Sequence, residues 1–374
     1  MPGVSEKELL KLKADGWNSS LIDLRLRYAE YDSTVKYLRP LVGLDRIHPR
    51  YLPTQKSGRW SITNPPLTNF SANCINPTCE HRGEEHRATW ADCWSLRDVV
   101  LPDPGTYFLK WDWKAIEAKL AAAYSGDDED LELFTQGADI HTVTLCKMFG
   151  YPQPPNIMSP YKDPACEAWR ALTGLHSDNS WQRVGAKACR YGLAYGIDQR
   201  AIHEVKDIDL LSRQAGLDKA GREAMAKAYL DSKPKLKAWK QRTWRQIYET
   251  QEVRTPLGRR KRLFFGAEEY LSWRRYGRPG DAGKTGLNHL AQGQVADMMN
   301  LTIIAIKRRW PESRLAYQAH DGLTMIFPDT VQPWPEIQGI VEQEWPMGNG
   351  RVIQSTADWG VVRSDGSHGE VGCT

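Results

Sequence analysis

Residues 106–125 read TYFLKWDWKAIEAKLAAAYS, and this stretch decides the fold class. Its first part alternates apolar or aromatic side chains with others, which predicts a β-strand that begins at Thr106 and ends at Asp112. Its second part, residues 116–125, has apolar residues at helical spacing, and the following Gly126 predicts the end of a helix. The sequence therefore predicts a strand that leads directly into a helix, with the carboxylate of Asp112 at the junction.

Strand-like sequence lies on both sides of a long helical block. Residues 46–72 lose helical periodicity and contain four prolines, whereas residues 127–250 are mostly helical in pattern. A hairpin is predicted at 252–264, followed by a long helix from about 288 to 309 and two short strands joined by His320-Asp321-Gly322. This order predicts an α+β protein in which one domain is built from both ends of the chain and a helical domain is inserted into it.

Composition excludes several classes of protein. The chain has 374 residues, of which 41% are hydrophobic and 26% charged, so wholesale disorder is excluded. The longest apolar run, residues 301–306, is far shorter than a membrane span, and no apolar signal segment follows Met1. Seven cysteines without regular spacing indicate a reducing compartment, and we expect a cytoplasmic location, in a bacterium or a phage-infected cell, and no membrane partner.

The positive charge is clustered. The net charge of +4 is too small to identify a nucleic-acid-binding protein, but basic residues gather at 259–262, 274–275 and 307–309. Such clusters suit contacts with phosphates, although solvated helix ends and turns would explain them equally well.

Two aspartates stand at the ends of predicted strands. Asp112 ends its strand, and Asp321 lies in the turn between the strands Arg314–Ala319 and Leu323–Phe327. Asp-Gly is a strong hairpin signal, so turn formation alone would account for Asp321. If the two carboxylates are adjacent, however, their charges repel unless a cation lies between them, and such pairs hold the two Mg²⁺ ions of phosphoryl transfer.

A second group of candidate residues follows one face of a predicted helix. Arg183, Lys187, Tyr191 and Tyr195 are spaced by four, and each step advances only about 40° beyond a full turn. Such a face offers cations for a triphosphate at one end and aromatic rings for a base at the other.

These segments resemble the motifs of the family A (polymerase I-like) DNA polymerases. Residues 111–117 are similar to motif A, residues 183–196 to motif B and residues 318–321 to motif C. Smaller blocks in the same order agree with the resemblance: Ser57-Gly58-Arg59, Asn64-Pro65, Asp139-Ile140-His141-Thr142, Thr255 to Arg260, and Asn288 with Gln292-Gly293.

The resemblance implies a right-hand polymerase fold, with an antiparallel-sheet palm and a large helical fingers insertion. On this basis we expect a rudimentary thumb or N-terminal helices at 1–45 and the first part of the palm at 46–124. The fingers would occupy 125–287 and the second part of the palm 288–374. Residues 73–93 would be an insertion in the palm.

The resemblance also implies roles for individual residues. Asp112 and Asp321 would hold two Mg²⁺ ions, which Mn²⁺ can replace, and Lys187 would donate a proton to pyrophosphate. The expected nucleotide-binding residues are His141, Arg183 and Lys187 at the phosphates, Tyr191 at the sugar and base, Tyr195 at the templating position, and Glu117 as a steric gate against a 2′-hydroxyl. The expected DNA-binding residues are Arg59, Arg259, Arg260, Asn288, Gln292, Gln318 and His320.

Several residues depart from the family pattern. Gly322 follows Asp321 where an acidic residue is usual, and metal affinity is expected to fall. Arg190 replaces a small polar residue, which predicts extra positive charge near the nucleotide. Tyr191 stands where many members have phenylalanine, which predicts ready use of dideoxynucleotides.

The insertion at 73–93 contains three cysteines and two histidines: Cys74, Cys79, His81, His86 and Cys93. These could supply the four ligands of a structural Zn²⁺. No Cys-x2-Cys pair is present, and five candidates for four places make the spacing unspecific, so an exposed loop with unrelated cysteines is the favoured interpretation and a zinc site is the alternative.

We therefore expect a DNA-templated DNA polymerase that adds dNTPs to a primer 3′-hydroxyl on primer-template DNA, without a proofreading exonuclease on this chain. The trimmed motifs suggest a phage-like enzyme and a protein partner that supplies a thumb or processivity. A phage-type single-subunit RNA polymerase or primase-like enzyme is the nearest alternative, because these share the Arg-x3-Lys helix. A non-catalytic DNA-binding subunit is the second alternative.

Overall fold

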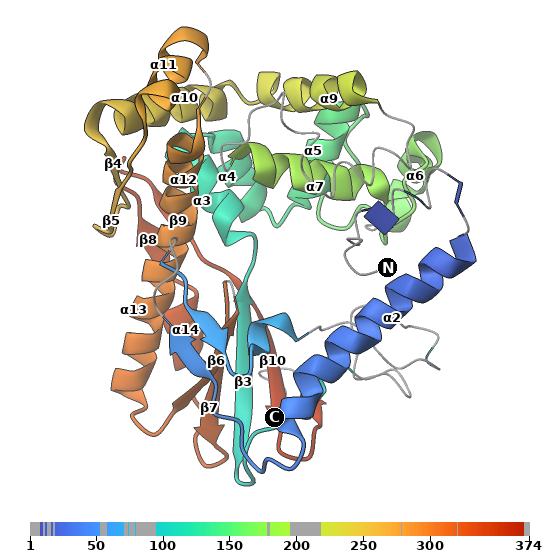
Figure 1. Ribbon diagram of the computed structural model, residues 1–374, viewed down its shortest axis with the longest axis vertical. Coiled ribbons are helices and arrows are strands. Elements are labelled where there is room, and N and C mark those ends of the chain that lie inside the picture. The colour runs from blue at the N-terminus through green and yellow to red at the C-terminus, as the bar shows by residue number, and fades with distance from the viewer. Residues whose placement is uncertain are drawn as a thin grey trace. The chain divides into compact units, whose positions relative to one another are not determined.

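The computed structural model describes residues 8, 9, 12, 16, 17, 19–52, 58–70, 74, 79, 95–177, 180–194, 218–277, 279–319 and 321–369. The chain divides into two compact units (Figure 1). The first unit comprises Met1–Lys114, Met298–Gln343 and Ser355–Thr374, and the second comprises Ala115–Asp297 and Glu344–Gln354. The chain enters the second unit at Ala115.

The first unit is built on a five-stranded antiparallel sheet. Its strand order is β11-β10-β3-β7-β6, with β3 at the centre. The strands are β3 (Thr106–Trp113), β6 (Arg314–Ala319), β7 (Gly322–Pro328), β10 (Ala357–Arg363) and β11 (His368–Gly369). The predicted strands at 106–112, 314–319 and 323–327 are confirmed, and β3 and β7 each extend slightly beyond the predicted bounds.

One face of β3 carries large apolar side chains into the core. Leu109 and Trp113 are almost fully buried, and Tyr107 stacks on Phe327 of β7 with ring centroids 6.0 Å apart. Nε1 of Trp113 donates a 3.0 Å hydrogen bond to the carbonyl of Val341, which ends α14 (Glu336–Val341). Because side chains alternate along a strand, Asp112 lies on the opposite face from these residues.

A smaller layer of the first unit carries Arg59. The two-stranded sheet of β1 (Arg50–Leu52) and β2 (Ser61–Thr63) packs with the short helices η2 (Leu67–Asn69) and η3 (Leu96–Val99). Their shared core contains Ile62, Leu67, Phe70 and Leu96. Arg59 therefore lies just before β2, next to a packed cluster.

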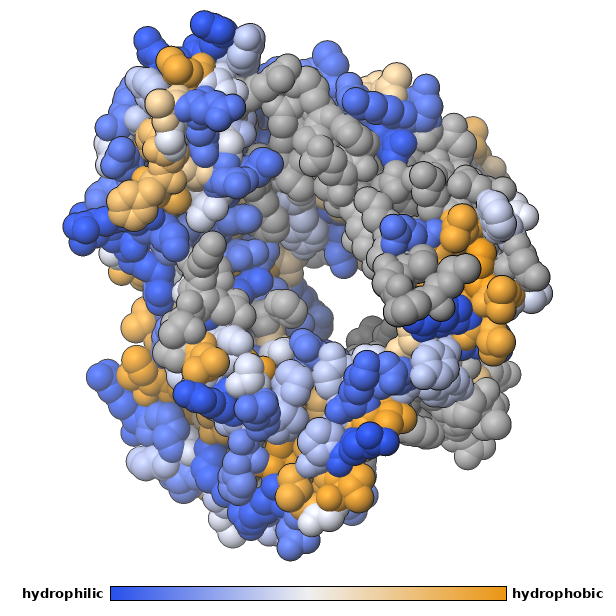
Figure 2. Space-filling model, in the orientation of Figure 1, coloured by the Kyte–Doolittle hydropathy of each residue, from blue (hydrophilic) through white to orange (hydrophobic). Residues whose placement is uncertain are grey.

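The predicted N-terminal helical region contains α2 (Ser19–Leu38), followed by the turn η1 (Arg39–Leu41). Leu21, Leu24, Tyr28 and Val35 on α2 are each at least half exposed, whereas Ile22 is buried. Hydrophobic surface is visible along α2 in Figure 2. Even so, no described helix combines the length and the apolar character needed to cross a bilayer.

The second unit is mainly helical around one apolar core, which includes Leu145, Leu193, Tyr229 and Ile247. Its helices are α3 (Ile116–Ser125), α4 (Asp128–Thr135), α5 (Ile140–Phe149), η4 (Pro164–Cys166), α6 (Glu167–Thr173), α7 (Trp181–Ala194), α9 (Lys219–Asp231), α10 (Pro234–Thr250), α11 (Ala267–Tyr276) and α12 (Asp281–Asn288). Two hairpins complete it: β4 (Glu252–Arg254) with β5 (Arg260–Arg262), and β8 (Glu344–Pro346) with β9 (Val352–Gln354).

The helix predicted from 288 to 309 is interrupted near its start. After α12, residues His289–Gly293 form a π-helical turn, and α13 continues over Gln294–Arg309. His289 is buried, and a Cβ at position 293 would lie only 3.0 Å from its ring. The wide turn and the glycine together accommodate a buried histidine that a regular helix with a larger residue would not.

Candidate active site

The structure brings Asp112 and Asp321 together in the first unit. Asp112 is paired with Gly322 in the β3–β7 register, and Asp321 immediately precedes Gly322. The backbone N–H of Trp113 donates a 3.3 Å hydrogen bond to the carbonyl of Asp321, which ties the turn to the end of β3. The two carboxyl groups are close enough for the charge of Asp321 to act on Asp112.

The electrostatics of Asp112 reflect this crowding. Partial burial and the neighbouring charges of Asp321 and Asp358 raise the pKa of Asp112 to about 7, against a smaller opposing effect of Arg97. Two carboxylates that share a proton form a site that a divalent cation can occupy in the proton's place. The donor set therefore fits the Mg²⁺ that the sequence predicts.

Gly322 has a steric role beside this pair. A Cβ at this position would lie 3.2 Å from the carbonyl oxygen of Trp111 and 3.3 Å from that of Ala319. It would also touch the Asp112 carboxyl carbon at 3.5 Å. A larger residue would thus press on the strand that carries Asp112.

In the second unit, α7 carries three of the four predicted nucleotide-binding residues of motif B. Lys187 is exposed, whereas Arg183 and Tyr191 are half-buried. The ring of Tyr191 lies against that of His141 on α5, with centroids 5.7 Å apart. Tyr195 lies outside the described residues.

Arg183 is held by an acidic partner. Its Nε and Nη2 atoms each donate a 2.9 Å hydrogen bond to the two oxygens of Asp139. Asp139 is also the N-cap of α5 and accepts hydrogen bonds from the backbone N–H groups of His141 and Thr142. This carboxylate thus orients Arg183 and begins the helix that carries His141.

His141 is neutral in the free protein. Burial, followed by the positive charges of Arg183, Arg190 and Lys187, lowers the pKa of His141 to about 3, although Asp139 opposes this shift. Within the described part of the chain, its Nδ1 atom is buried without a hydrogen-bond partner. A neutral imidazole can donate a hydrogen bond to a phosphate, but it adds no positive charge before the ligand arrives.

Glu117 and Tyr191 meet at one pocket of the second unit. Glu117 lies in the first turn of α3, and both side chains line the pocket together with Ala121 and Ala194. The acidic residue and the aromatic ring expected at the sugar therefore share a cavity.

Arg190 corrects one expectation from the sequence. Extra positive charge near the nucleotide was predicted for it, but the side chain is buried and its Nη2 donates a 2.6 Å hydrogen bond to Asp130. The guanidinium charge is balanced inside the unit, since burying a charge is unfavourable unless the charge is paired.

The predicted DNA-binding residues lie in both units. In the first unit, Arg59 is close enough to Asp321 for their charges to interact, although burial lowers the pKa of Arg59, and Gln318 is buried in β6. In the second unit, Asn288 ends α12 and Gln292 lies in the π-helical turn. His320 lies outside the described residues.

The two arginines of the β4–β5 hairpin differ in environment. Arg259 forms a 2.6 Å ion pair with Asp297, which also accepts a 3.2 Å hydrogen bond from Thr255. Arg260 is exposed and lies 3.9 Å from Glu252. Arg260 is thus the more available of the two for a phosphate.

Only two of the five candidate zinc ligands lie among the described residues. His81, His86 and Cys93 lie outside the described residues, while Cys74 is buried and Cys79 is partly exposed. Among the residues that the structure describes, no cluster of three or more metal-binding side chains occurs.

Sequence reasoning assigned no role to five charged residues beside these sites: Asp127, Asp130, Asp139, Lys233 and Asp358. Asp127 and Asp139 precede helices, and this N-cap pattern is visible in the sequence but has an ordinary structural explanation. Asp358 gains its place only through the register of β10 with β3, in which it pairs with Asp112. No local sequence signal reports such a pairing.

Comparison with known proteins identifies the family. The sequence profile of DNA polymerase family A matches residues 3–159 and 169–346. The chain belongs to this family, and its α+β fold is the right-hand polymerase fold.

Individual relatives agree with this assignment. The chain is 25% identical over 315 residues to DNA polymerase I of Lactococcus lactis subsp. lactis, covering 83% of this chain and 30% of the relative. It is 27% identical over 338 residues to the thermostable DNA polymerase I of Thermus filiformis, covering 87% of this chain and 34% of the relative. The chain therefore spans only about a third of the length of these curated relatives.

A solved structure shares the fold. It is described as the POL domain of Pol1 from M. smegmatis in complex with DNA primer-template and dNTP. The two structures superimpose with a TM-score of 0.67 at 24% identity, over 97% of this chain and 56% of the other.

Proposed function

We propose that this chain is a DNA-templated DNA polymerase that transfers a deoxynucleotidyl group from a dNTP to a primer 3′-hydroxyl. The observation that carries the proposal is the adjacency of Asp112 and Asp321 at the end of the central strand β3, where Asp112 pairs with Gly322 and Trp113 donates a backbone hydrogen bond to Asp321. Family membership and the arginine- and lysine-bearing face of α7 support it.

In this proposal the acid pair holds the metal ions. Asp112 and Asp321 supply carboxylate oxygens, the ligand type that Mg²⁺ prefers. Two Mg²⁺ ions held there would supply Lewis acidity, which would lower the pKa of the primer 3′-hydroxyl and stabilise negative charge on the triphosphate and on pyrophosphate. Because the pKa of Asp112 is raised, binding of a cation at the pair competes with protonation of Asp112.

The helical unit binds the triphosphate. Lys187 is exposed and can approach an anionic oxygen, and it is the proposed proton donor to the departing pyrophosphate. Arg183 exchanges part of its pairing with Asp139 for the phosphates. His141 donates a hydrogen bond from its neutral ring, and its pKa rises once an anion is bound.

The shared pocket of Glu117 and Tyr191 selects the sugar. We propose that Glu117 crowds a ribose 2′-hydroxyl and that the Tyr191 hydroxyl occupies the space of a missing 3′-hydroxyl. The residues expected to contact primer-template DNA are Arg59, Arg259, Arg260, Asn288, Gln292, Gln318 and His320.

The test of this proposal compares dNTP with rNTP incorporation on one primed DNA template in the presence of Mg²⁺. Template-directed extension that prefers dNTPs is the expected result. A preference for rNTPs would indicate the RNA polymerase or primase-like alternative. DNA binding without incorporation of either would indicate a non-catalytic subunit.

A further inference from the structure

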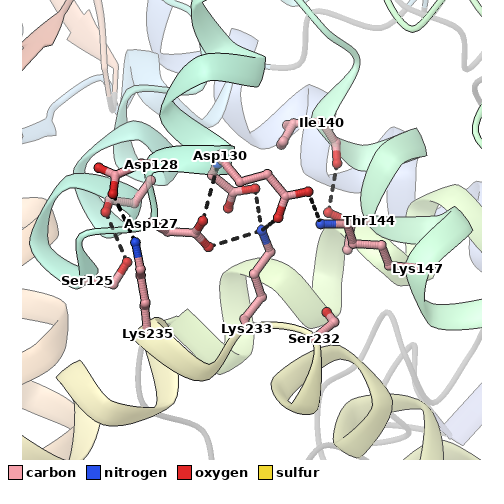
Figure 3. A network of polar contacts seen from close by, with 12 residues as sticks. Ser125, Asp127, Asp128, Asp130, Ile140, Thr144, Lys147, Ser232, Lys233 and Lys235 are labelled. Atoms are coloured by element: carbon pink, nitrogen blue, oxygen red, sulfur yellow. Dashed lines mark hydrogen bonds and ion pairs between the residues drawn. The ribbon is translucent and has the colours of Figure 1, made fainter.

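A buried network of charges ties α7 to two other parts of the helical unit. The amino group of Lys233, at the start of α10, forms 2.6 Å and 3.0 Å ion pairs with Asp130 and Asp127 of the α4 region (Figure 3). The second oxygen of Asp130 accepts a 2.6 Å hydrogen bond from Arg190 on α7. Arg190 also donates a 3.1 Å hydrogen bond to Thr144 on α5. Asp130 thus connects α7 with the α9–α10 junction.

The four residues at the centre of this network are buried. Arg190, Lys233 and Asp130 are at most 4% exposed, and Asp127 is 7% exposed. Two buried cations face the two buried carboxylates, and Glu129, which is 58% exposed, lies 3.8 Å from Lys233 at the edge of the network. Asp130 and Asp127 raise the pKa of Lys233, although burial alone would lower it. Since an unpaired charge at this depth is strongly unfavourable, rotation or sliding of α7 away from Asp130 is opposed.

The position of Arg190 on α7 connects the network with the nucleotide-binding face. On a helix, Arg190 lies about 60° to one side of Lys187, and Tyr191 lies about 40° to the other. Arg183, seven residues before Arg190, is anchored to Asp139 on the same side. Two ion pairs, two turns apart, therefore fix the rotation that presents Lys187 and Tyr191.

A purely stabilising role does not explain this arrangement. Buried ion pairs add little stability compared with apolar residues of similar volume, but they restrict which arrangements are allowed. Asp130 and Arg190 also line the pocket that contains Glu117 and Tyr191. The pair is therefore next to the residues whose position it would control.

We propose that Asp130 is a positioning residue for the incoming nucleotide: through Arg190 and Lys233 it sets the rotation of α7, and with it the placement of Lys187 and Tyr191. This inference rests on the proposed function. It assigns to the Asp130–Arg190–Lys233 network a control over nucleotide affinity rather than over DNA binding.

The test is a double variant that removes the ion pair without leaving an unpaired charge. In Asp130→Leu with Arg190→Leu, Lys233 keeps Asp127 as its partner, so the fold is expected to be retained. We expect the KM for dNTP to rise about tenfold or more, with the Kd for primer-template unchanged and the melting temperature close to that of the wild type. Asp130→Asn should also raise the KM for dNTP.

A matched pair of lysines supplies the control. Lys233 and Lys235 both reach aspartates of α4, but the Lys235–Asp128 pair is exposed (Figure 3). Lys233→Met should raise the KM for dNTP, whereas Lys235→Met should leave it unchanged.

Equilibrium binding of dATP in the presence of Ca²⁺ provides a readout that does not require turnover. The inference is overturned if a folded double variant binds dATP and uses dNTPs as the wild type does. It is also overturned if the variant loses stability, DNA affinity and kcat together, since that pattern indicates a structural role. If the wild-type protein does not extend a primer, the proposed function is contradicted. The comparison of dATP binding by the wild type and the double variant still decides the inference.

Discussion

Asp112 lies directly opposite Asp358 in the antiparallel pair of β3 and β10. The side chains of opposed residues emerge on the same face of a sheet, so Asp112 has a carboxylate neighbour in addition to Asp321. Asp358 is 74% exposed and forms a 2.6 Å ion pair with Lys114, which shields part of its charge. The acid pair is thus placed where negative charge accumulates, which favours a cation and disfavours the empty site.

The negative charge that gathers around Asp112 is expected to lower the stability of the folded protein. The pKa of Asp112 is raised to about 7, so the folded state holds its proton more tightly than the unfolded state and loses stability as the pH rises toward 7. Asp112→Asn should therefore raise the melting temperature at pH 8 in the presence of a chelator, and by less at pH 5. Thermal unfolding of both proteins at the two pH values measures this. A lower melting temperature for Asp112→Asn at pH 8 would contradict the assignment.

The lowered pKa of His141 predicts that stability depends on pH with the opposite sign. Its pKa is lowered to about 3, so its contribution to stability is complete above the unfolded value near 6.5 and is lost as the pH falls. The slope from this residue is at most ~1.4 kcal/mol per pH unit. His141→Gln should flatten the dependence of the unfolding free energy between pH 4.5 and 7.

Denaturant titrations at several pH values test the His141 prediction. His176→Gln, the same substitution at an exposed histidine, is the control for the change of residue type. If the unfolding free energy of His141→Gln depends on pH as steeply as that of the wild type, the imidazole is not held neutral.

The position of Glu117 in this pocket predicts that the protein discriminates against ribonucleotides. Truncation to Ala opens the pocket shared with Tyr191, so Glu117→Ala should increase the relative kcat/KM for rNTPs by roughly tenfold or more. Exposed Glu132 on α4 offers a control, because Glu132→Ala should not change the ratio. Equal discrimination by wild type and Glu117→Ala would remove Glu117 from the sugar site.

The tyrosine at position 191 predicts that the protein incorporates dideoxynucleotides readily. If its hydroxyl fills the space of a missing 3′-hydroxyl, Tyr191→Phe should lower chain termination by dideoxynucleotides by about tenfold or more. Tyr151→Phe, a half-buried tyrosine after α5, is the control. Strong discrimination by the wild type that Tyr191→Phe does not change would contradict this role.

Elements with a strong local pattern could be predicted from the sequence. The alternation at 106–112 and the Asp-Gly turn at 321–322 gave the two strands that meet at the acid pair. Gly126 adopts a left-handed conformation at the end of α3, as its position in the sequence predicted. These features depend on neighbouring residues, so one segment is enough to reveal them.

The misses depend on partners far away in the sequence. Arg190 was expected to add positive charge near the nucleotide, but its guanidinium is buried and paired with Asp130, sixty residues earlier, which also binds Lys233. The π-helical turn at His289–Gly293 likewise depends on how a buried histidine packs. Local periodicity carries no information about either contact.

The central claim is that Asp112 and Asp321 hold the metal ions for templated DNA synthesis, and Mg²⁺-dependent primer extension tests it most directly. The wild-type protein should add the templated nucleotide, and Asp321→Asn should extend at least about a thousandfold more slowly while binding primer-template normally. Asp329→Asn, a change at an exposed aspartate just after β7, should extend like the wild type. Extension by Asp321→Asn at the wild-type rate, or no Mg²⁺-dependent extension by the wild type, would contradict the claim.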